Sequence, residues 1–183
     1  IFVSKKVTFI TTEHSTENRR RNSLWRPIDR WMYTRYSRTI CISNEALTAL
    51  ESHVGKHPTR NIVIQNGVDT IRFTTIPLGE IPPENTEVHI IMIAAFRSGK
   101  NQETLVRALA LLPKRFRLTL VGTGERMEYV RTIAQEAGVS GRVTFAGHRD
   151  DIPEVLKSSD ITVLSSHYEG LSLSSVECMA AGR

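Results

Sequence analysis

With 183 residues the chain is long enough for one ordinary domain core, and it carries a formal net charge of +5. No apolar run approaches the roughly 20 residues of a membrane-spanning helix, and the first residues hold no apolar stretch of the signal-peptide type, which favours a cytosolic protein. The two cysteines, Cys41 and Cys178, lie in apolar surroundings and fit neither a disulfide framework nor a metal site, so we expect buried free thiols.

The first predicted element is a buried strand over residues 6–12, which are rich in β-branched and aromatic side chains. Turn-forming residues follow, so His14 should project from the carboxyl end of this strand. In open α/β sheets the carboxyl ends of the strands form the edge where ligands bind. His14 is therefore a candidate site residue, and a structural histidine is the alternative interpretation.

An arginine-rich segment, residues 19–38, comes next. Seven arginines face one acid, Asp29, and apolar side chains interleave with them at near-helical spacing. These apolar residues are Trp25, Ile28, Trp31, Met32 and Tyr36. The segment could lie on an anionic membrane surface or contact a phosphorylated acceptor. Alternatively, it is a solvated helix whose aromatic face packs on its own domain.

The rest of the first half predicts a helix over 24–36, a strand over 39–42 and a helix that Ser43 caps and that reaches about His53. We place a linker around residues 55–60, and hence domains over 1–57 and 58–183. From Val88 strands and helices alternate, with strands over 88–95, 115–121, 142–146 and 160–164 and helices over 101–112, 125–137, 151–157 and 173–181. This alternation predicts an α/β fold with a parallel, doubly wound sheet.

Each predicted strand of the second half delivers a loop to one edge of the sheet. The loops carry Arg97 and Lys100, then Gly122 and Gly124, then Gly147, His148 and Arg149. The last unit is a strand, a loop with Glu169 and a helix with Glu177, seven residues intervening between the two acids. A strand, a loop and a helix expose unpaired N–H groups and the positive end of the helix dipole, which suit a diphosphate.

Five ordered segments resemble the retaining nucleotide-sugar glycosyltransferases of family 4, which have the GT-B fold. The most specific begins Glu169-Gly170-Leu171-Ser172-Leu173 and runs into Glu177-Cys178-Met179-Ala180-Ala181-Gly182. Residues 64–69 with Phe73 resemble the segment that opens the family's second domain, residues 121–125 its glycine loop, and residues 143–147 the strand that follows. His14 matches a short Thr-x-His motif. The resemblance is strong over 60–183 and weak over 7–50.

The resemblance implies two Rossmann-like domains, the first mostly missing and the second nearly complete. It implies a retaining hexosyltransferase that uses a UDP- or GDP-sugar, without a metal or a further cofactor. Lys100, Arg97 and the N–H groups of residues 172–175 would hold the leaving diphosphate, and Glu169 and His14 would lie near the transferred sugar. The family's usual arginine precedes the lysine by five residues, where this chain has Ala95.

The donor site implied by the resemblance is larger. Glu177 would accept hydrogen bonds from the ribose hydroxyls, while the nucleobase would meet Gly147 and either His148 or Arg149. The remaining donor-binding residues would be Gly122, Gly124, Gly170, Leu171, Ser172, Leu173 and Ser174.

The implied acceptor is a saccharide or lipid-linked saccharide of cell-envelope polysaccharide, lipopolysaccharide or glycolipid synthesis, in the cytoplasm or at the inner face of the membrane. Nucleic acid is not expected. A sugar-nucleotide epimerase of the same fold, or a non-catalytic fragment that binds nucleotides or anionic surfaces, are the alternatives. Because one domain is largely absent, an inactive isolated chain is compatible with this prediction.

Overall fold

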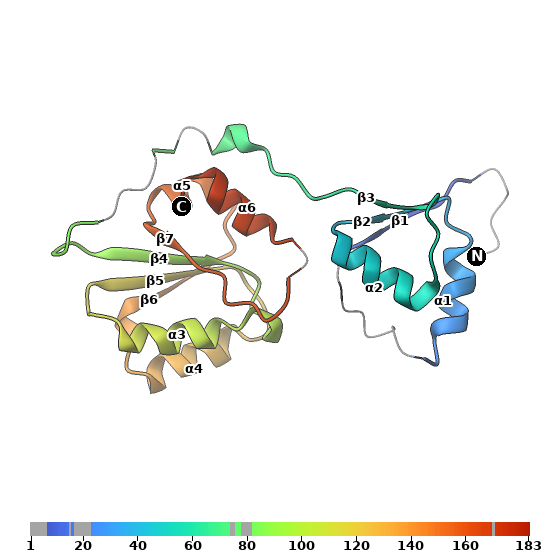
Figure 1. Cartoon of the computed structure of the whole chain (residues 1–183). Helices are drawn as coiled ribbons and strands as arrows, with labels where there is room; N and C mark the ends of the chain where they lie inside the picture. Colours follow the sequence, from blue (N-terminus) through green and yellow to red (C-terminus); the bar gives the residue numbers. More distant parts are fainter. Residues whose placement is uncertain (1–6, 15, 17–22, 74–75, 78–81, 170) are drawn as a thin grey trace. The chain divides into compact units, whose positions relative to one another are not determined.

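The computed structural model describes residues 7–14, 16, 23–73, 76–77, 82–169 and 171–183. The chain divides into two compact units. The first comprises residues 1–67 with 169–172, and the second comprises residues 68–168 with 173–183. Gly170 and the arginines at positions 19–21 lie outside the described residues. Each unit is an α/β structure with a parallel sheet (Figure 1).

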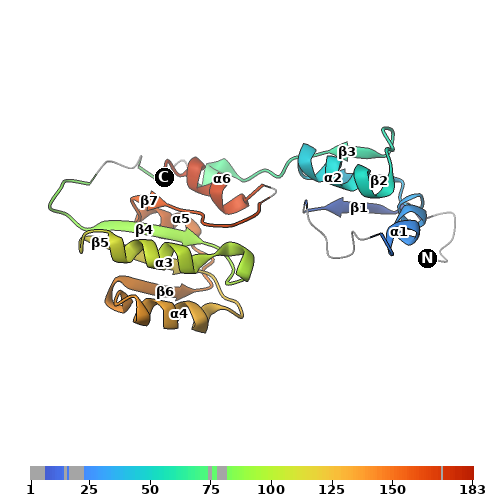
Figure 2. The same cartoon turned by 60° about the horizontal axis from the view of Figure 1, so that its bottom comes forward.

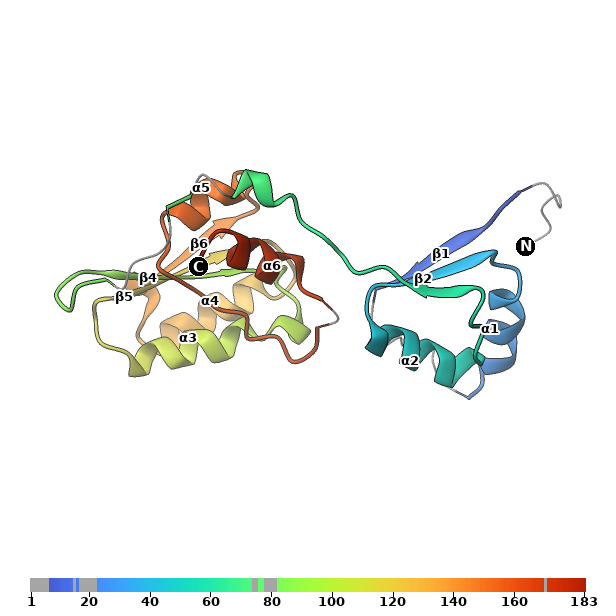
Figure 3. The same cartoon turned by 45° about the horizontal axis from the view of Figure 1, so that its top comes forward.

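The first unit has three strands and two helices. They are β1 (Ile10–Glu13), α1 (Arg26–Tyr33), β2 (Arg38–Cys41), α2 (Asn44–Val54) and β3 (Asn61–Val63). The strands pair in the order β1-β2-β3, and both helices lie on the same side of them (Figure 3). The predicted N-cap is present, because the Ser43 hydroxyl accepts a hydrogen bond from the N–H of Ala46 at 3.1 Å.

The position of β3 differs from the predicted domain boundary. The sequence placed that boundary between residues 57 and 58, but β3 pairs with β2 through Thr39–Asn61, Ile40–Ile62 and Cys41–Val63. Asn61–Val63 therefore extend the sheet of the first unit, and the compact units divide after Gly67. A three-residue strand can only be assigned to a sheet by its partner, which the local sequence does not name.

The second unit alternates strands and helices as predicted. Its elements are β4 (Val88–Ile93), α3 (Gln102–Leu111), β5 (Phe116–Val121), α4 (Met127–Glu136), β6 (Val143–Gly147), α5 (Ile152–Lys157), β7 (Ile161–Thr162) and α6 (Leu173–Ala180). The sheet order is β6-β5-β4-β7, with all neighbours parallel. Short 3₁₀ turns occupy Thr70–Arg72, Ser98–Lys100 and Ser140–Arg142.

Helices cover both faces of this sheet, α3 and α4 on one face and α5 and α6 on the other (Figure 2). Strand β4 shows why its apolar run is continuous. Ile90 and Met92 are buried in the core beneath α3 and α4, whereas Ile91 belongs to the core beneath α5 and α6. Successive side chains of a strand point to opposite faces, so a strand that is covered twice needs apolar residues at every position.

Candidate active site

In the second unit the carboxyl ends of the parallel strands lie along one edge of the sheet, and the order of the strands reverses beside β4. The chain runs outward from β4 through β5 to β6 and then returns to the other side of β4 as β7. Such a reversal leaves a crevice between the loops that follow β4 and β7, and ligands bind there in open α/β sheets. The loop after β4 carries Arg97 and Lys100, two of the predicted catalytic residues.

Several hydrogen bonds fix the loop after β4. The N–H of Phe96 donates to the Thr123 carbonyl at 2.9 Å, and the Gln102 side-chain amide donates to the Ala95 carbonyl at 3.0 Å. Asn101 adopts a left-handed conformation with φ of 53°, which is uncommon for a residue other than glycine. Its side-chain oxygen accepts a hydrogen bond from the Thr104 hydroxyl at 2.8 Å. Lys100 thus lies on a loop whose shape is determined from both ends.

The loop after β7 holds the same segment from the other side. The Ser165 hydroxyl lies 3.1 Å from the Lys100 carbonyl and 2.9 Å from the Asn101 carbonyl, and the N–H of His167 donates to the Gly99 carbonyl at 2.9 Å. Sequence reasoning missed Ser165. Two serines after a strand carry no signal of a contact with a backbone 64 or 65 residues away.

Gly122 and Gly124 have a structural requirement of their own. Both have positive φ, and a Cβ atom would lie 2.2 Å from the Ala94 carbonyl oxygen at Gly122 and 2.4 Å from that of Phe96 at Gly124. The N–H of Gly122 also donates to the Gly147 carbonyl at 2.7 Å. Glycine is therefore needed at both positions because loops of the protein itself approach each other closely there. A donor-binding role of these glycines stays a prediction.

His148 and Arg149 follow β6 at the same edge, and both are exposed. The Arg149 guanidinium binds the Asp151 carboxylate through two nitrogens, one of them 2.7 Å from the nearest oxygen. This hydrogen bonding holds the pKa of the Asp151 carboxyl below its ordinary value and raises that of Arg149. His148 lies 3.2 Å from the Asp150 carboxylate. A stacking role of Arg149 would have to compete with this ion pair.

Helix α6 closes a small cavity of about 120 Å³ against β4 and β7. It is lined by Ile91, Ile93, Thr162, Val163, Leu164, Ser174, Ser175, Cys178 and Met179. Small-molecule sites usually offer about 300–1,000 Å³, so a nucleotide sugar does not fit inside it. Burial raises the pKa of the Cys178 thiol, as expected for a buried free cysteine. Glu177 is half-buried on this helix.

The predicted loop residues before α6 are divided between the units. Leu173 and Ser174 begin α6 in the second unit, whereas residues 169–172 group with the first. The predicted site residues that belong to the second unit are Arg97, Lys100, Gly122, Gly124, Gly147, His148, Leu173, Ser174 and Glu177, and their predicted roles stay predictions. Glu169, Leu171 and Ser172 lie outside that unit, and their predicted roles stay predictions.

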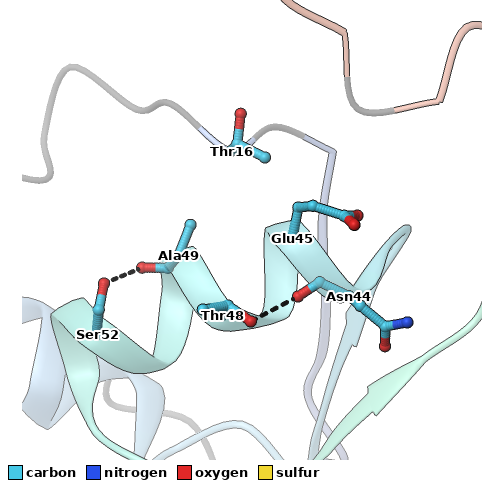
Figure 4. Close-up of a pocket in the computed structure, with 6 residues that line it drawn as sticks. All are labelled: Thr16, Asn44, Glu45, Thr48, Ala49 and Ser52. Carbon is cyan, nitrogen blue, oxygen red and sulfur yellow. Dashed lines mark hydrogen bonds between the residues drawn. The ribbon is translucent and has the colours of Figure 1, made fainter.

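In the first unit His14 lies directly after β1 and is exposed, as the strand prediction required. A separate open hollow of about 460 Å³ lies along α2, lined by Thr16, Asn44, Glu45, Thr48, Ala49 and Ser52 (Figure 4). The Thr48 and Ser52 hydroxyls donate to carbonyls of their own helix, at 2.9 and 2.8 Å. Each keeps a lone pair that can accept a further hydrogen bond. For this stretch the sequence predicted only a helix that Ser43 caps.

No group of three or more His, Cys, Asp or Glu side chains among the described residues is placed to hold a metal ion. In the same part of the chain, no helix has the length and apolar character to cross a membrane.

Two family descriptions match the chain in succession. The model of the glycosyl transferases group 1 matches residues 79–183, and that of glycosyltransferase family 4 matches residues 2–72. The lipopolysaccharide core biosynthesis glycosyltransferase LpsE of Rhizobium meliloti is 33% identical over 120 residues, covering 66% of this chain and 35% of that protein. An Escherichia coli enzyme, UDP-Gal:alpha-D-GlcNAc-diphosphoundecaprenol alpha-1,3-galactosyltransferase, is 28% identical over 159 residues, 80% of this chain and 41% of the enzyme.

Among solved structures, Anabaena Alr3699/HepE in complex with UDP-glucose matches with a TM-score of 0.80 and 22% identity, covering 96% of this chain and 52% of that one. At this identity the likeness concerns the fold alone. The chain spans less than half of the length of the curated relatives it matches.

Proposed function

The chain belongs to the glycosyl transferases group 1 family, and on that premise we propose that it carries the donor site of a retaining hexosyltransferase. The predicted family and the predicted GT-B fold are both confirmed. The proposed enzyme would transfer a sugar from a nucleoside diphosphate to an acceptor hydroxyl. The bond between the anomeric carbon and the diphosphate breaks, the acceptor oxygen bonds to that carbon on the same face, and the hydroxyl proton passes to the leaving diphosphate.

The observation that carries the proposal is the fixed loop with Lys100 at the reversal of the sheet. Hydrogen bonds from Ser165 and His167 hold this loop against the segment that leads to α6. The cations of Lys100 and Arg97 and the N–H groups at the start of α6 could then stabilise the charge that develops on the leaving diphosphate. Such stabilisation is most effective when the donors are already in place and need not reorganise during the reaction.

The donor is proposed to be a UDP- or GDP-sugar, and UDP is tested first because a solved relative of the same fold binds UDP-glucose. The two carboxylate oxygens of Glu177 would accept hydrogen bonds from the two ribose hydroxyls. Glu169 and His14 are proposed to lie near the transferred sugar, and the N–H groups of residues 172–175 are proposed to hold the diphosphate. The proposal includes no metal and no further cofactor.

For the acceptor we propose a saccharide or a lipid-linked saccharide of envelope polysaccharide synthesis. The support comes from relatives whose names specify lipopolysaccharide core synthesis and a diphosphoundecaprenol acceptor. A lipid-linked acceptor is presented at a membrane, so the proposed place of action is the cytoplasm at the membrane surface.

A thermal-shift panel of UDP, GDP, ADP and their sugar conjugates tests the donor site on this chain. A ligand that binds only the folded state adds about 2.7 kcal/mol of stability at 100 times its dissociation constant. We expect one nucleotide series to raise the melting temperature. Glu177→Ala should abolish this shift, whereas Glu136→Ala, which removes an exposed glutamate from α4, should preserve it. A folded chain that no nucleotide stabilises would contradict the donor-site assignment.

Product analysis then separates the two enzymatic alternatives. A transferase releases the nucleoside diphosphate at a rate that depends on the added acceptor. Conversion of the sugar nucleotide into its epimer without an acceptor would support the epimerase instead.

A further inference from the structure

Large apolar side chains are exposed on α1 and on the two residues that precede it. Leu24 is 78% exposed, Ile28 and Trp31 are each 50% exposed, and Trp25 is 41% exposed. Ile28 and Trp31 lie three positions apart on one face of α1, Leu24 and Trp25 directly precede the helix, and Arg35 follows it by two residues. We call these residues, together with Arg30 and Arg38, the α1 surface.

Polar contacts hold α1 in this orientation. The Asp29 carboxylate lies 2.9 Å from the His53 ring nitrogen of α2, and both side chains are buried. The Arg26 guanidinium donates to the carbonyls of Ser52 and His53, each at 2.9 Å. The Tyr33 hydroxyl donates to the Glu13 carboxylate at the end of β1. The charged residue Asp29 thus points inward while the apolar residues point outward, the reverse of an ordinary surface helix.

The charge of the α1 surface has one sign. Between residues 23 and 38 the only acid is the buried Asp29. Arg30, Arg35 and Arg38 are exposed, and in the described part of the chain no ion pair engages them. The Arg35 guanidinium instead lies over the Trp31 ring, 5.2 Å from its centroid. A binding partner of the α1 surface should therefore be anionic and should also offer an apolar region for the indole and aliphatic side chains.

An anionic bilayer surface meets both requirements. Tryptophan rings favour the boundary between headgroups and acyl chains, and arginines beside them bind lipid phosphates. A polynucleotide offers phosphates but little room for Leu24 and Ile28. We propose that the α1 surface docks on anionic lipid, with Leu24, Ile28 and Trp31 entering the headgroup boundary. The docking does not depend on the proposed sugar transfer, so the two can fail separately.

The protein contains its own probe. Its only two tryptophans, Trp25 and Trp31, both lie on the α1 surface. Vesicles of phosphatidylcholine mixed with phosphatidylglycerol should shift the tryptophan emission to shorter wavelength. Lipids brominated on the acyl chain should quench this emission. Vesicles of phosphatidylcholine alone should do neither. Added salt should weaken the binding, because the contact is partly electrostatic and exposed charges are screened.

Matched variants locate the contact. Arg30→Glu with Arg35→Glu should lower the affinity for the anionic vesicles by at least about 25-fold, since one cation near such a surface contributes about fivefold. Arg107→Glu with Lys114→Glu makes the same change of charge at exposed positions of the second unit and should leave most of the binding. Ile28→Ser should weaken binding about tenfold, the effect of losing one buried aliphatic side chain.

Three outcomes would overturn the proposal. The first is tryptophan emission that anionic vesicles leave unchanged. The second is an equal loss of binding in the two charge-reversed pairs, which would indicate net charge alone. The third is an emission shift that appears with a polyanionic nucleic acid or upon self-association of the chain, as measured by sedimentation, and not with vesicles. A thermal shift by UDP in the same preparation would show that the donor site is intact.

Discussion

The two units are stabilised in different ways. In the second unit apolar side chains are buried on both faces of a parallel sheet, in two large clusters beneath its two helix layers. In the first unit the buried apolar cluster consists of Cys41, Ala46, Leu50 and Val54, and a buried Asp29–His53 pair joins its two helices. The second unit is therefore determined mainly by its apolar pattern. The first depends more on a few specific polar contacts.

The largest expected effect is a cavity in the second unit. Leu120 of β5 is 1% exposed and lies in the core beneath α3 and α4. Replacing such a leucine by alanine removes its contacts and leaves a cavity, so Leu120→Ala should lower the free energy of unfolding by about 2–5 kcal/mol. Urea denaturation followed by far-UV circular dichroism measures this change. Leu111→Ala removes the same atoms from a residue that is 87% exposed and should change stability by less than about 0.5 kcal/mol.

The same contrast explains which elements the sequence predicted well. The alternating strands and helices from Val88 onward all lie within about two residues of their predicted ends, but the last strand is less than half its predicted length. There five residues were predicted, and β7 contains only Ile161 and Thr162. An apolar run indicates burial, and Val163 and Leu164 are indeed packed against the core. They do not continue the strand, because β7 pairs with β4 at only two positions.

The sequence did not predict which distant residues a strand or a side chain would contact. The predicted strand over residues 6–12 begins only at Ile10, where pairing with Arg38 starts. Trp25, Ile28 and Trp31 are 41–50% exposed, so packing of this aromatic face on its own domain accounts for only part of these side chains. Their orientation follows from the pairing of Asp29 with His53, 24 residues away, and no local pattern identifies such a partner.

For the site, the sequence identified residues that follow strands and missed those that hold them. Lys100 and Gly122 were predicted because strand ends gather at one edge of a parallel sheet. Ser165 acts on the backbone carbonyls of Lys100 and Asn101, so its partners carry no chemical signature in the sequence. The requirement for glycine at position 124 similarly comes from the Phe96 carbonyl on a neighbouring loop.

A smaller effect is expected from the buried pair of the first unit. His53→Ala leaves the Asp29 carboxylate without its histidine partner, and losing one partner of a buried hydrogen bond costs about 1–3 kcal/mol. Tryptophan emission follows this unit directly, because both tryptophans belong to α1 and its N-terminal flank. His89→Ala, at a half-exposed histidine of the second unit, serves as the control and should have little effect.

The double variant Asp29→Leu with His53→Leu sharpens this comparison. Replacing both members of a buried pair by apolar residues is often close to neutral, so it should destabilise less than His53→Ala alone. A double variant at least as unstable as the single one would indicate that the pair itself, and not the cost of an uncompensated partner, stabilises the first unit.

The smallest expected effect concerns the ion pair of Arg149 and Asp151 in the second unit, where both side chains are nearly half exposed. Hydrogen bonding from Arg149 lowers the pKa of Asp151 in the folded state. The folded protein therefore binds this proton less readily than the unfolded chain, and the pair stabilises the fold above the ordinary aspartate pKa of about 3.9. As the pH falls through the lowered pKa, that contribution disappears.

Asp151→Asn should thus melt slightly below the parent protein between about pH 5 and about pH 7, with a difference that shrinks below about pH 4. Glu136→Gln, at an exposed glutamate of α4, should show no such trend. A difference that instead grew as the pH fell would mean that Asp151 is stabilised in its protonated form, against the geometry of the pair.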